Sequence, residues 1–128
     1  MELMALFLAA TIEFKLPAGL LESLCYVEST HKITAIHHDD GGEDSLGVCQ
    51  VQHTTAKYLG FKGTTKQLMD PKTNIHYAAK YLAKQIKRYN SVSRGIIAYN
   101  RGNARNLITS KYLDKVIKTW VNRSRNVR

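Results

Sequence analysis

Residues 20–29 read Leu20-Leu21-Glu22-Ser23-Leu24-Cys25-Tyr26-Val27-Glu28-Ser29, and their apolar side chains recur with helical spacing. Leu21, Leu24 and Cys25 stand at positions i, i+3 and i+4, and Glu28 follows at i+7 on the same face. That face of a helix is expected to enter the core. The stretch therefore predicts a helix whose buried face ends in a carboxyl group.

Glu28 has two interpretations on this stretch alone. Loss of hydration disfavours the charged form of a carboxyl, and a carboxyl kept protonated near neutral pH can act as a general acid. Alternatively, Glu28 lies at the edge of the apolar face and pairs with Lys32 at i+4, which supports a helix by about 0.3–0.5 kcal/mol. The structural interpretation is favoured at this point, because paired helical glutamates are common and catalytic ones are rare.

Length and composition predict one soluble domain over residues 1–128. The chain has 44% hydrophobic and 23% charged residues, which is ordinary for a globular protein, and 14.5 kDa leaves no room for a second core. The apolar run from Leu3 to Thr11 is too short to span a bilayer. It also lacks the basic start of a signal peptide, since Glu2 precedes it and the first basic residue is Lys15, so we expect no export by the usual route.

The cysteines and the charge distribution carry further expectations. Cys25 and Cys49 both lie among apolar residues, which suits small buried thiols better than a disulfide framework, although their separation in space is open. From Arg101 onward eight basic residues stand against the single acid Asp114, out of a net charge of +9. The C-terminal part is therefore expected to face something anionic, and Arg123, Arg125 and Arg128, which follow the last apolar residue of the helical stripe, are expected to be dispensable for the fold.

Hydrophobic periodicity along the remaining chain predicts an all-α, or mainly α, protein. The expected helices cover residues 3–14, a segment from Pro17 through Glu28, residues 54–59, a turn at 65–69, a longer helix opened by Asp70 and Pro71, residues 93–102, and a last helix from Lys111. From Thr34 to Ser45 the periodicity stops, and we expect a polar, solvated loop there. Its histidines and acids form adjacent pairs rather than spaced ligands, so we predict no metal site.

Three polar residues in apolar surroundings remain ambiguous from the residues alone. Gln50 lies in the run Leu46–Val51, where its amide must either bond the backbone or face a cleft. Tyr99 and Asn100 stand where the apolar part of residues 93–102 ends. They either present polar tips to a pocket, or Tyr99 packs in the core and Asn100 caps the helix.

Four blocks in this order and spacing resemble the soluble lytic transglycosylase domain, glycoside hydrolase family 23. The family shows a Glu-Ser pair ending a helix, a Gly-Leu-Met-Gln-Ile/Val block, a Leu-x-Asp-Pro-x-x-Asn-Ile stretch and an Ala-Tyr-Asn-Ala-Gly block. The matching residues here are Glu28-Ser29, Ser45-Leu46-Gly47-Val48-Cys49-Gln50-Val51, Leu68-Met69-Asp70-Pro71-Lys72-Thr73-Asn74-Ile75 and Ala98-Tyr99-Asn100-Arg101-Gly102. Val48-Cys49 and Arg101 depart from the pattern without removing a reacting group. With the family in view, catalysis becomes the favoured interpretation of Glu28.

The resemblance implies a lysozyme-like fold and an enzyme that needs no cofactor. Glu28 would act as acid and then base to cleave the β-1,4 bond between N-acetylmuramic acid and N-acetylglucosamine, leaving 1,6-anhydromuramyl ends. It also implies that substrate is bound by the side chains of Ser29, Ser45, Gln50, Tyr99 and Asn100. The partner is then the peptidoglycan glycan strand, and the basic C-terminal part would contact anionic wall or outer-membrane components. We expect a monomer and no binding to nucleic acid.

Two rival functions stay open. A goose-type lysozyme-like hydrolase on the same fold would use water and a second carboxylate, about 6.5–9.5 Å from the acid in inverting enzymes. Asp39, Asp40, Glu43 and Asp44 are the candidates for that group. A non-catalytic wall-binding or nucleic-acid-binding module would keep the fold and use its basic end. The presence of Glu28 in an otherwise apolar stripe argues against this second rival. Small size, basicity and the expected lack of a signal peptide together are typical of a phage endolysin or virion-borne lysin. Such an enzyme is made in the host cytoplasm and acts on the peptidoglycan in the periplasm or cell wall.

Overall fold

Seven helices and three short strands make up the described part of the chain, residues 2–40 and 42–126, in this computed structural model. The side chains of Asp39, Asp40 and Asn126 lie outside that description. In chain order the elements are α1 (Leu3–Glu13), α2 (Leu20–Ser29), β1 (Ile36–Asp40), β2 (Glu43–Leu46), β3 (Val51–Gln52), α3 (His53–Tyr58), α4 (Thr65–Leu68), α5 (Pro71–Tyr89), α6 (Val92–Arg101) and α7 (Lys111–Asn126). The mainly α class predicted from the sequence is confirmed.

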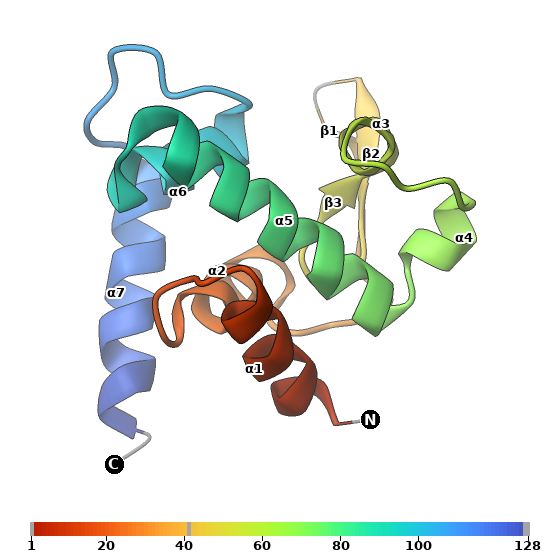
Figure 1. Cartoon of the computed structure of the whole chain (residues 1–128), viewed down its shortest axis with the longest axis horizontal. Coiled ribbons are helices and arrows are strands. Elements are labelled where there is room, and N and C mark those ends of the chain that lie inside the picture. The colour runs from red at the N-terminus through yellow and green to blue at the C-terminus, as the bar shows by residue number, and fades with distance from the viewer. Residues whose placement is uncertain (1, 41, 127–128) are drawn as a thin grey trace.

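Helix α5 crosses the middle of the molecule, with the small sheet, α3 and α4 on one side and α6 and α7 on the other (Figure 1). Its start is the predicted one, since the Asp70 side chain accepts a hydrogen bond from the Thr73 amide at 3.1 Å and Pro71 occupies the first turn. Its apolar stripe is buried at Ile75, Ala78, Ala79 and Leu82. This stripe is the centre of the core against which the other helices pack.

Helix α6 approaches α5 closely because residue 95 is glycine. A Cβ atom on Gly95 would come within 2.7 Å of the Ile86 Cα atom. The helix ends where the sequence predicted, at Gly102, whose φ of 88° lies in the left-handed region that favours glycine. This end of α6 carries Tyr99 and Asn100.

Helix α2 begins later than expected. Pro17 lies in the turn before the helix instead of opening it, and Gly19, with φ of 79°, precedes the first helical residue, Leu20. Helix α7 packs on α2, where the Trp120 Nε1 atom donates a hydrogen bond to the Ala18 carbonyl at 2.9 Å. The predicted last helix is thus confirmed, and its apolar side covers α2.

The prediction of a loop over residues 34–45 is wrong, although most of the described residues in this segment are exposed or half-buried, as expected. Strands β1 and β2 form an antiparallel hairpin in which Ile36 pairs with Leu46 and His37 with Ser45, and β3 adds to β2. The strands are short and mostly polar on both faces, so the hairpin is held by backbone pairing that apolar periodicity does not reveal.

Candidate active site

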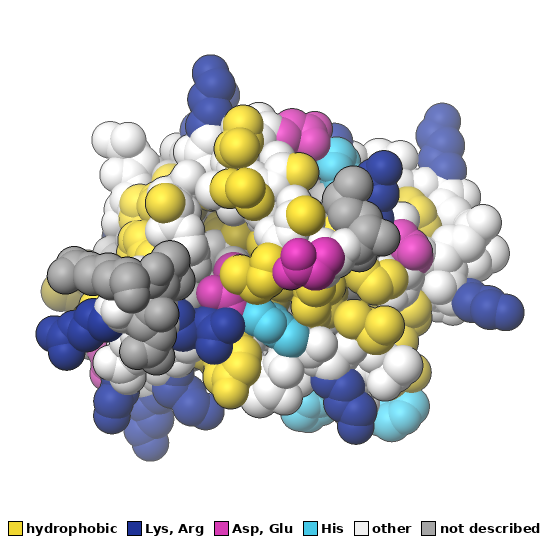
Figure 2. Space-filling view, turned by 90° about the horizontal axis from the view of Figure 1, so that it is seen from below, with side chains coloured by type: hydrophobic (Ala, Val, Ile, Leu, Met, Phe, Trp, Pro, Cys, Tyr) yellow, Lys and Arg dark blue, Asp and Glu magenta, His cyan; other side chains and the backbone are white. Residues whose placement is uncertain are grey.

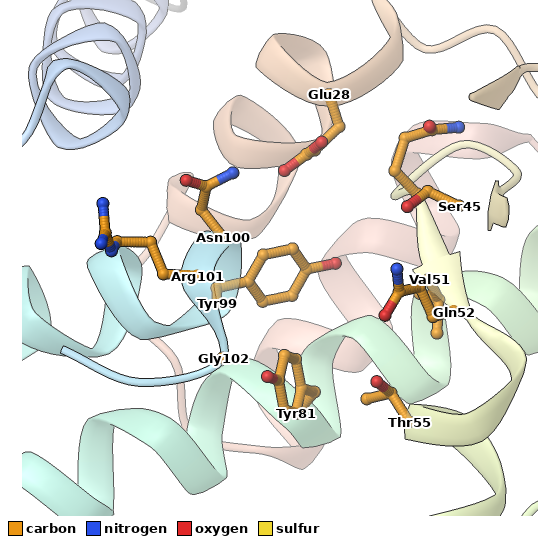
Figure 3. Close-up of a pocket in the computed structure, with 11 residues that line it drawn as sticks. Glu28, Ser45, Val51, Gln52, Thr55, Tyr81, Tyr99, Asn100, Arg101 and Gly102 are labelled. Carbon is orange, nitrogen blue, oxygen red and sulfur yellow. The ribbon is translucent and has the colours of Figure 1, made fainter. Parts of the chain in front are cut away.

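Glu28 lies in the last turn of α2 and lines a cavity of about 330 Å³. The helix ends directly after it, at Ser29, because Thr30 adopts the left-handed conformation with φ of 54°. Lys32 therefore lies beyond the helix, and the i,i+4 pairing within one helix is not available to Glu28. Figure 3 shows the carboxyl group pointing into the cavity. The other lining residues are Ser45, Gln50, Val51, Gln52, Thr55, Tyr81, Tyr99, Asn100, Arg101 and Gly102.

Tyr112 fixes the carboxyl group of Glu28 from the first turn of α7. Its hydroxyl donates a hydrogen bond to Glu28 Oε2 at 2.5 Å. Burial, followed by the charge of Glu28, raises the pKa of Tyr112 well above its usual value, so the hydroxyl keeps its proton and remains a donor. Sequence reasoning missed this residue, because no local pattern connects positions 28 and 112.

Tyr99 forms the floor of the cavity. The side chain is only 8% exposed, and its hydroxyl donates to the Cys49 carbonyl at 2.8 Å. Burial is also the main reason why the pKa of Tyr99 is raised well above its usual value. Its ring lies 5.3 Å from that of Tyr81, a second tyrosine of the cavity that the sequence did not indicate. Tyr99 therefore combines the two roles that the sequence left open, packing in the core and lining a pocket.

Gln50 also satisfies both of its alternatives. Its amide nitrogen donates to the carbonyls of Ala35 and Gly47, at 3.2 and 3.0 Å, and the side chain lines the cavity. The residue is held in the left-handed region, with φ of 55°. The backbone carbonyls thus fix both the amide and the turn that carries it.

Asn74 supports that turn from inside the core. This fully buried side chain on α5 donates to the Leu46 and Leu68 carbonyls and accepts a hydrogen bond from the Cys49 amide, all at 2.8–2.9 Å. Residue 47 must be glycine for this contact, because a Cβ atom there would lie 2.6 Å from the Asn74 amide nitrogen. The match of residues 68–75 to the family stretch therefore has a physical meaning: Asn74 holds the turn next to the cavity.

A disulfide bond joins Cys25 of α2 to Cys49 of the same turn. The expectation of two free buried thiols is wrong. Both cysteines are fully buried, as predicted, but the fold brings their Cα atoms within 4.5 Å of each other. The bond connects the helix of Glu28 to the turn of Gln50.

The two predicted serines occupy different positions. Ser45 is buried and lines the cavity. Ser29 is not among the described lining residues, and its hydroxyl donates to the Val48 carbonyl at 2.7 Å and accepts from the Lys32 amide at 3.1 Å. Ser29 thus joins the end of α2 to the turn of Gln50, while its contact with substrate remains a prediction.

Asn100 and Arg101 line the cavity from the exposed end of α6. Gly102, not Asn100, occupies the helix C-cap, so the capping interpretation of Asn100 is wrong. Figure 3 shows Glu28 and Asn100 on the same side of the Tyr99 ring. A polar amide and a cation therefore stand beside the acid.

The described acids of the hairpin do not reach this cavity. Glu43 and Asp44 line a separate hollow with His53, Thr65 and other residues. The Glu43 carboxylate is bonded to the Thr54 amide at 3.0 Å and to its hydroxyl at 2.6 Å, at the start of α3. Asp39 and Asp40 were candidates as well, and their side chains lie outside the described part of the structure.

Neither a metal cluster nor a membrane-spanning helix is found within residues 2–40 and 42–126. No three of the His, Cys, Asp or Glu side chains that the structure describes, a set without Asp39 and Asp40, are grouped so that they could hold a metal ion. None of the helices in that part combines the length and apolar character needed to cross a bilayer.

Helix α7 carries much of the basic charge, and one of its arginines is structural. Figure 2 shows Lys and Arg side chains gathered on the side of the molecule where α7 lies. Arg123 binds the carboxylate of Glu22 through two nitrogens, at 2.9 and 2.6 Å, and Glu22 is only 8% exposed. This ion pair argues against the expectation that Arg123 is dispensable for the fold. Arg125 is exposed, as predicted, and Arg128 lies outside the described residues.

Known proteins match the chain over most of its length. Residues 5–124 match the family model described as Transglycosylase SLT domain. Protein IpgF of Shigella flexneri and that of Shigella sonnei are each 26% identical to it over 93 residues, which cover 71% of this chain and 61% of the relative. The X-ray structure of an inactive mutant of the lytic transglycosylase Slt from Pseudomonas aeruginosa matches with a TM-score of 0.81 and 20% identity, over 97% of this chain and 24% of that chain. The chain thus spans less than two thirds of these curated relatives and about a quarter of the solved one.

Proposed function

The chain belongs to the transglycosylase SLT domain family, and on this premise we propose that it is a peptidoglycan lytic transglycosylase with Glu28 as its acid and base. The fold predicted from the four sequence blocks is confirmed by the match to Slt. The position of Glu28 carries the proposal: of the described residues lining the cavity, it is the one with a carboxyl group. The solved relative is inactive as a Glu-to-Gln mutant, which supports a glutamate as the reacting group of this fold.

The proposed reaction needs one carboxyl group. Protonated Glu28 donates its proton to the glycosidic oxygen as the bond from that oxygen to the anomeric carbon of N-acetylmuramic acid breaks. The resulting carboxylate takes the proton of the muramyl 6-hydroxyl as that oxygen bonds to the anomeric carbon. The products are a free N-acetylglucosamine 4-hydroxyl and a 1,6-anhydromuramyl end. No water is consumed, and Glu28 is protonated again.

Tyr112 orients the carboxyl group for this exchange. Its hydroxyl donates to Oε2, so the proton that Glu28 carries before the reaction resides on Oε1. Once Glu28 has given up this proton, the same hydrogen bond stabilises the carboxylate. We assign binding of the sugar rings to Gln50, Tyr99 and Asn100, which share the cavity with the acid.

Substitution of Glu28 by Gln tests the assignment. The variant keeps the shape of the side chain but cannot exchange a proton, so glycan cleavage should fall by about a hundredfold or more while the melting temperature stays near that of wild type. Glu43→Gln and Asp44→Asn are the matched controls and should keep their activity. Wall-lytic activity of Glu28→Gln within threefold of wild type would contradict the proposal.

The reaction products separate the transglycosylase from the hydrolase. Anhydro and reducing ends differ by one water, so mass spectrometry of the sugars released from purified peptidoglycan distinguishes them. The positions of Glu43 and Asp44 favour anhydro ends, because neither shares the cavity of Glu28. Mainly reducing ends, together with a sensitive Asp39→Asn or Asp40→Asn variant, would establish the hydrolase instead.

We also propose that the domain serves as a phage endolysin or virion-borne lysin that reaches the wall through its basic surface. The support is the net charge of +9 and the cations on the side of α7. Purified protein should lyse cells whose outer membrane has been permeabilised, and lysis should weaken as salt screens the attraction. Sedimentation equilibrium should give a monomer. Salt-independent lysis would contradict the role of the basic surface.

A further inference from the structure

The cavity of Glu28 continues into a second hollow between α3 and α5. The two share Thr55, Tyr81 and Gly102 as lining residues. Figure 3 shows Thr55 and Tyr81 on the side of the Tyr99 ring opposite to Glu28. A chain-like substrate held at the acid therefore has a continuous path past the two tyrosines into the second hollow, which has a volume of about 470 Å³.

The two parts of this path differ in charge, because Glu28 and Arg101 line the first cavity whereas the charged residues lining the second hollow are all cations. The second hollow is lined by Lys84 and Arg88, which lie one helical turn apart on the same face of α5. Among the described residues no Asp or Glu lines it, and no carboxylate forms an ion pair with either cation. The acid thus lies at one end of the groove and two cations without an anionic partner lie at the other.

Both cations are held in place by their neighbours. The Lys84 ammonium lies 4.8 Å from the centre of the Tyr58 ring. One terminal nitrogen of Arg88 donates to the Gly102 carbonyl at 3.3 Å and to the Gln85 side-chain oxygen at 3.4 Å. Gln85 is itself 4% exposed and donates to the same Gly102 carbonyl. A buried amide therefore orients the guanidinium group, whose other donors remain available.

We propose that this second hollow binds carboxylates of the peptide stem that the muramyl residue carries. The inference rests on the proposed function, because only a glycan held at Glu28 brings a stem into the groove. Arg88 would receive a carboxylate through its remaining N–H donors, and Lys84 would add a point charge. Phosphates of wall polymers share this anionic chemistry, and the substrates chosen below distinguish the two sources.

Binding to uncleaved strands tests the subsite without requiring turnover. The Glu28→Gln protein is titrated calorimetrically with soluble glycan strands free of wall polymers, either carrying stems or stripped of them by an amidase. We expect tighter binding to the stem-bearing strands. Adding Lys84→Gln and Arg88→Gln should weaken that binding by about tenfold, the size expected for the loss of a charged hydrogen bond, and should abolish the preference. Lys87→Gln, an exposed cation on the same helix outside both lining sets, is the matched control and should preserve it.

Kinetics of the otherwise wild-type enzyme give the second readout. On stem-bearing strands the Lys84→Gln/Arg88→Gln variant should show a KM raised about tenfold with kcat within twofold, and on stripped strands both constants should be unchanged. Equal affinity of the Glu28→Gln protein for the two strands would overturn the inference. So would equal losses on both strands, which would place the cations against the sugars. A loss seen only in a third titration, on strands that still carry their wall polymers, would assign the hollow to phosphates and also overturn the inference. If the enzyme cleaves neither strand, the proposed function fails, and the binding comparison still decides the subsite.

Discussion

Replacing Arg123 by Gln should destabilise the fold, although Arg123 belongs to a basic, mostly exposed helix. Its Nε atom donates a hydrogen bond to Glu22 Oε1 at 2.9 Å, and one terminal nitrogen forms an ion pair with Glu22 Oε2 at 2.6 Å. The guanidinium group also lies 4.4 Å from the centre of the Tyr26 ring. The carboxylate side chain of Glu22 is 11% exposed, and after the substitution His31, at 3.0 Å, is its remaining ionisable partner. A buried carboxylate would therefore lose most of its compensation.

The size of the expected loss in stability follows from how exposed the Glu22–Arg123 ion pair is. Removing one partner of a fully buried ion pair costs about 3–5 kcal/mol, whereas an exposed pair contributes about 0–1 kcal/mol. The Arg123 side chain is 34% exposed, so water can reach one side of this pair. We therefore expect the free energy of unfolding to fall by about 2–3 kcal/mol, which corresponds to a melting temperature lower by roughly 6–12 °C for a domain of this size.

Urea unfolding followed by circular dichroism measures this change, provided that the urea dependence of the free energy is the same in both proteins. Arg125→Gln is the matched control, because Arg125 is exposed on the same helix, and it should stay within about 0.5 kcal/mol of wild type. The Glu22→Gln single variant and the Glu22→Gln/Arg123→Gln double variant then complete a double-mutant cycle that isolates the coupling between the two side chains. Equal stability of Arg123→Gln and Arg125→Gln would refute the structural role of the pair.

Three further perturbations test the surroundings of the acid. Tyr112→Phe removes the donor to Glu28 and should lower kcat by about tenfold to a hundredfold, since a hydrogen bond to a charged group contributes about 1.5–3 kcal/mol; unchanged kcat would contradict the orienting role. Replacing Cys25 and Cys49 by Ala should lower the free energy of unfolding by about 3 kcal/mol, because the unfolded chain regains the entropy of a 24-residue loop. Chemical denaturation measures this loss, and a variant as stable as wild type would contradict the prediction. Asn74→Ala should lower the free energy of unfolding by about 3 kcal/mol or more, because it leaves two carbonyls and one amide buried without partners. An unchanged melting temperature in a calorimetric scan would refute this prediction.

Local patterns predicted the helices because a helix records its buried face in its own sequence. The stripe from Ile75 to Leu82, the cap at Asp70 and the stop at Gly102 all act within a few residues. The hairpin of residues 36–46 escaped prediction because its stabilisation comes from backbone pairing, which its polar side chains do not show. Apolar periodicity is informative only where one face of an element is buried.

The same distinction between local and long-range contacts separates the site residues that the sequence indicated from those that it did not. Gln50, Tyr99 and Asn100 stood out as polar groups in or beside apolar runs, and all three line the cavity with Glu28. Tyr112 had no such signal, because its contact to Glu28 joins residues 84 positions apart. Several tyrosines occur along the chain, and no local pattern indicates which of them the fold places against Glu28.

The contacts between α7 and α2 explain why these long-range groups belong together. Tyr112 meets Glu28, whereas Arg123 meets Glu22, so increasing numbers on α7 meet decreasing numbers on α2 and the two helices pack antiparallel. One end of this pair holds the acid and the other holds a buried carboxylate of the same helix. Because both contacts act on α2, the ion pair at Arg123 also helps to keep α7 in the position from which Tyr112 reaches Glu28. The basic helix is in this way part of the proposed catalytic site as well as part of the charged surface.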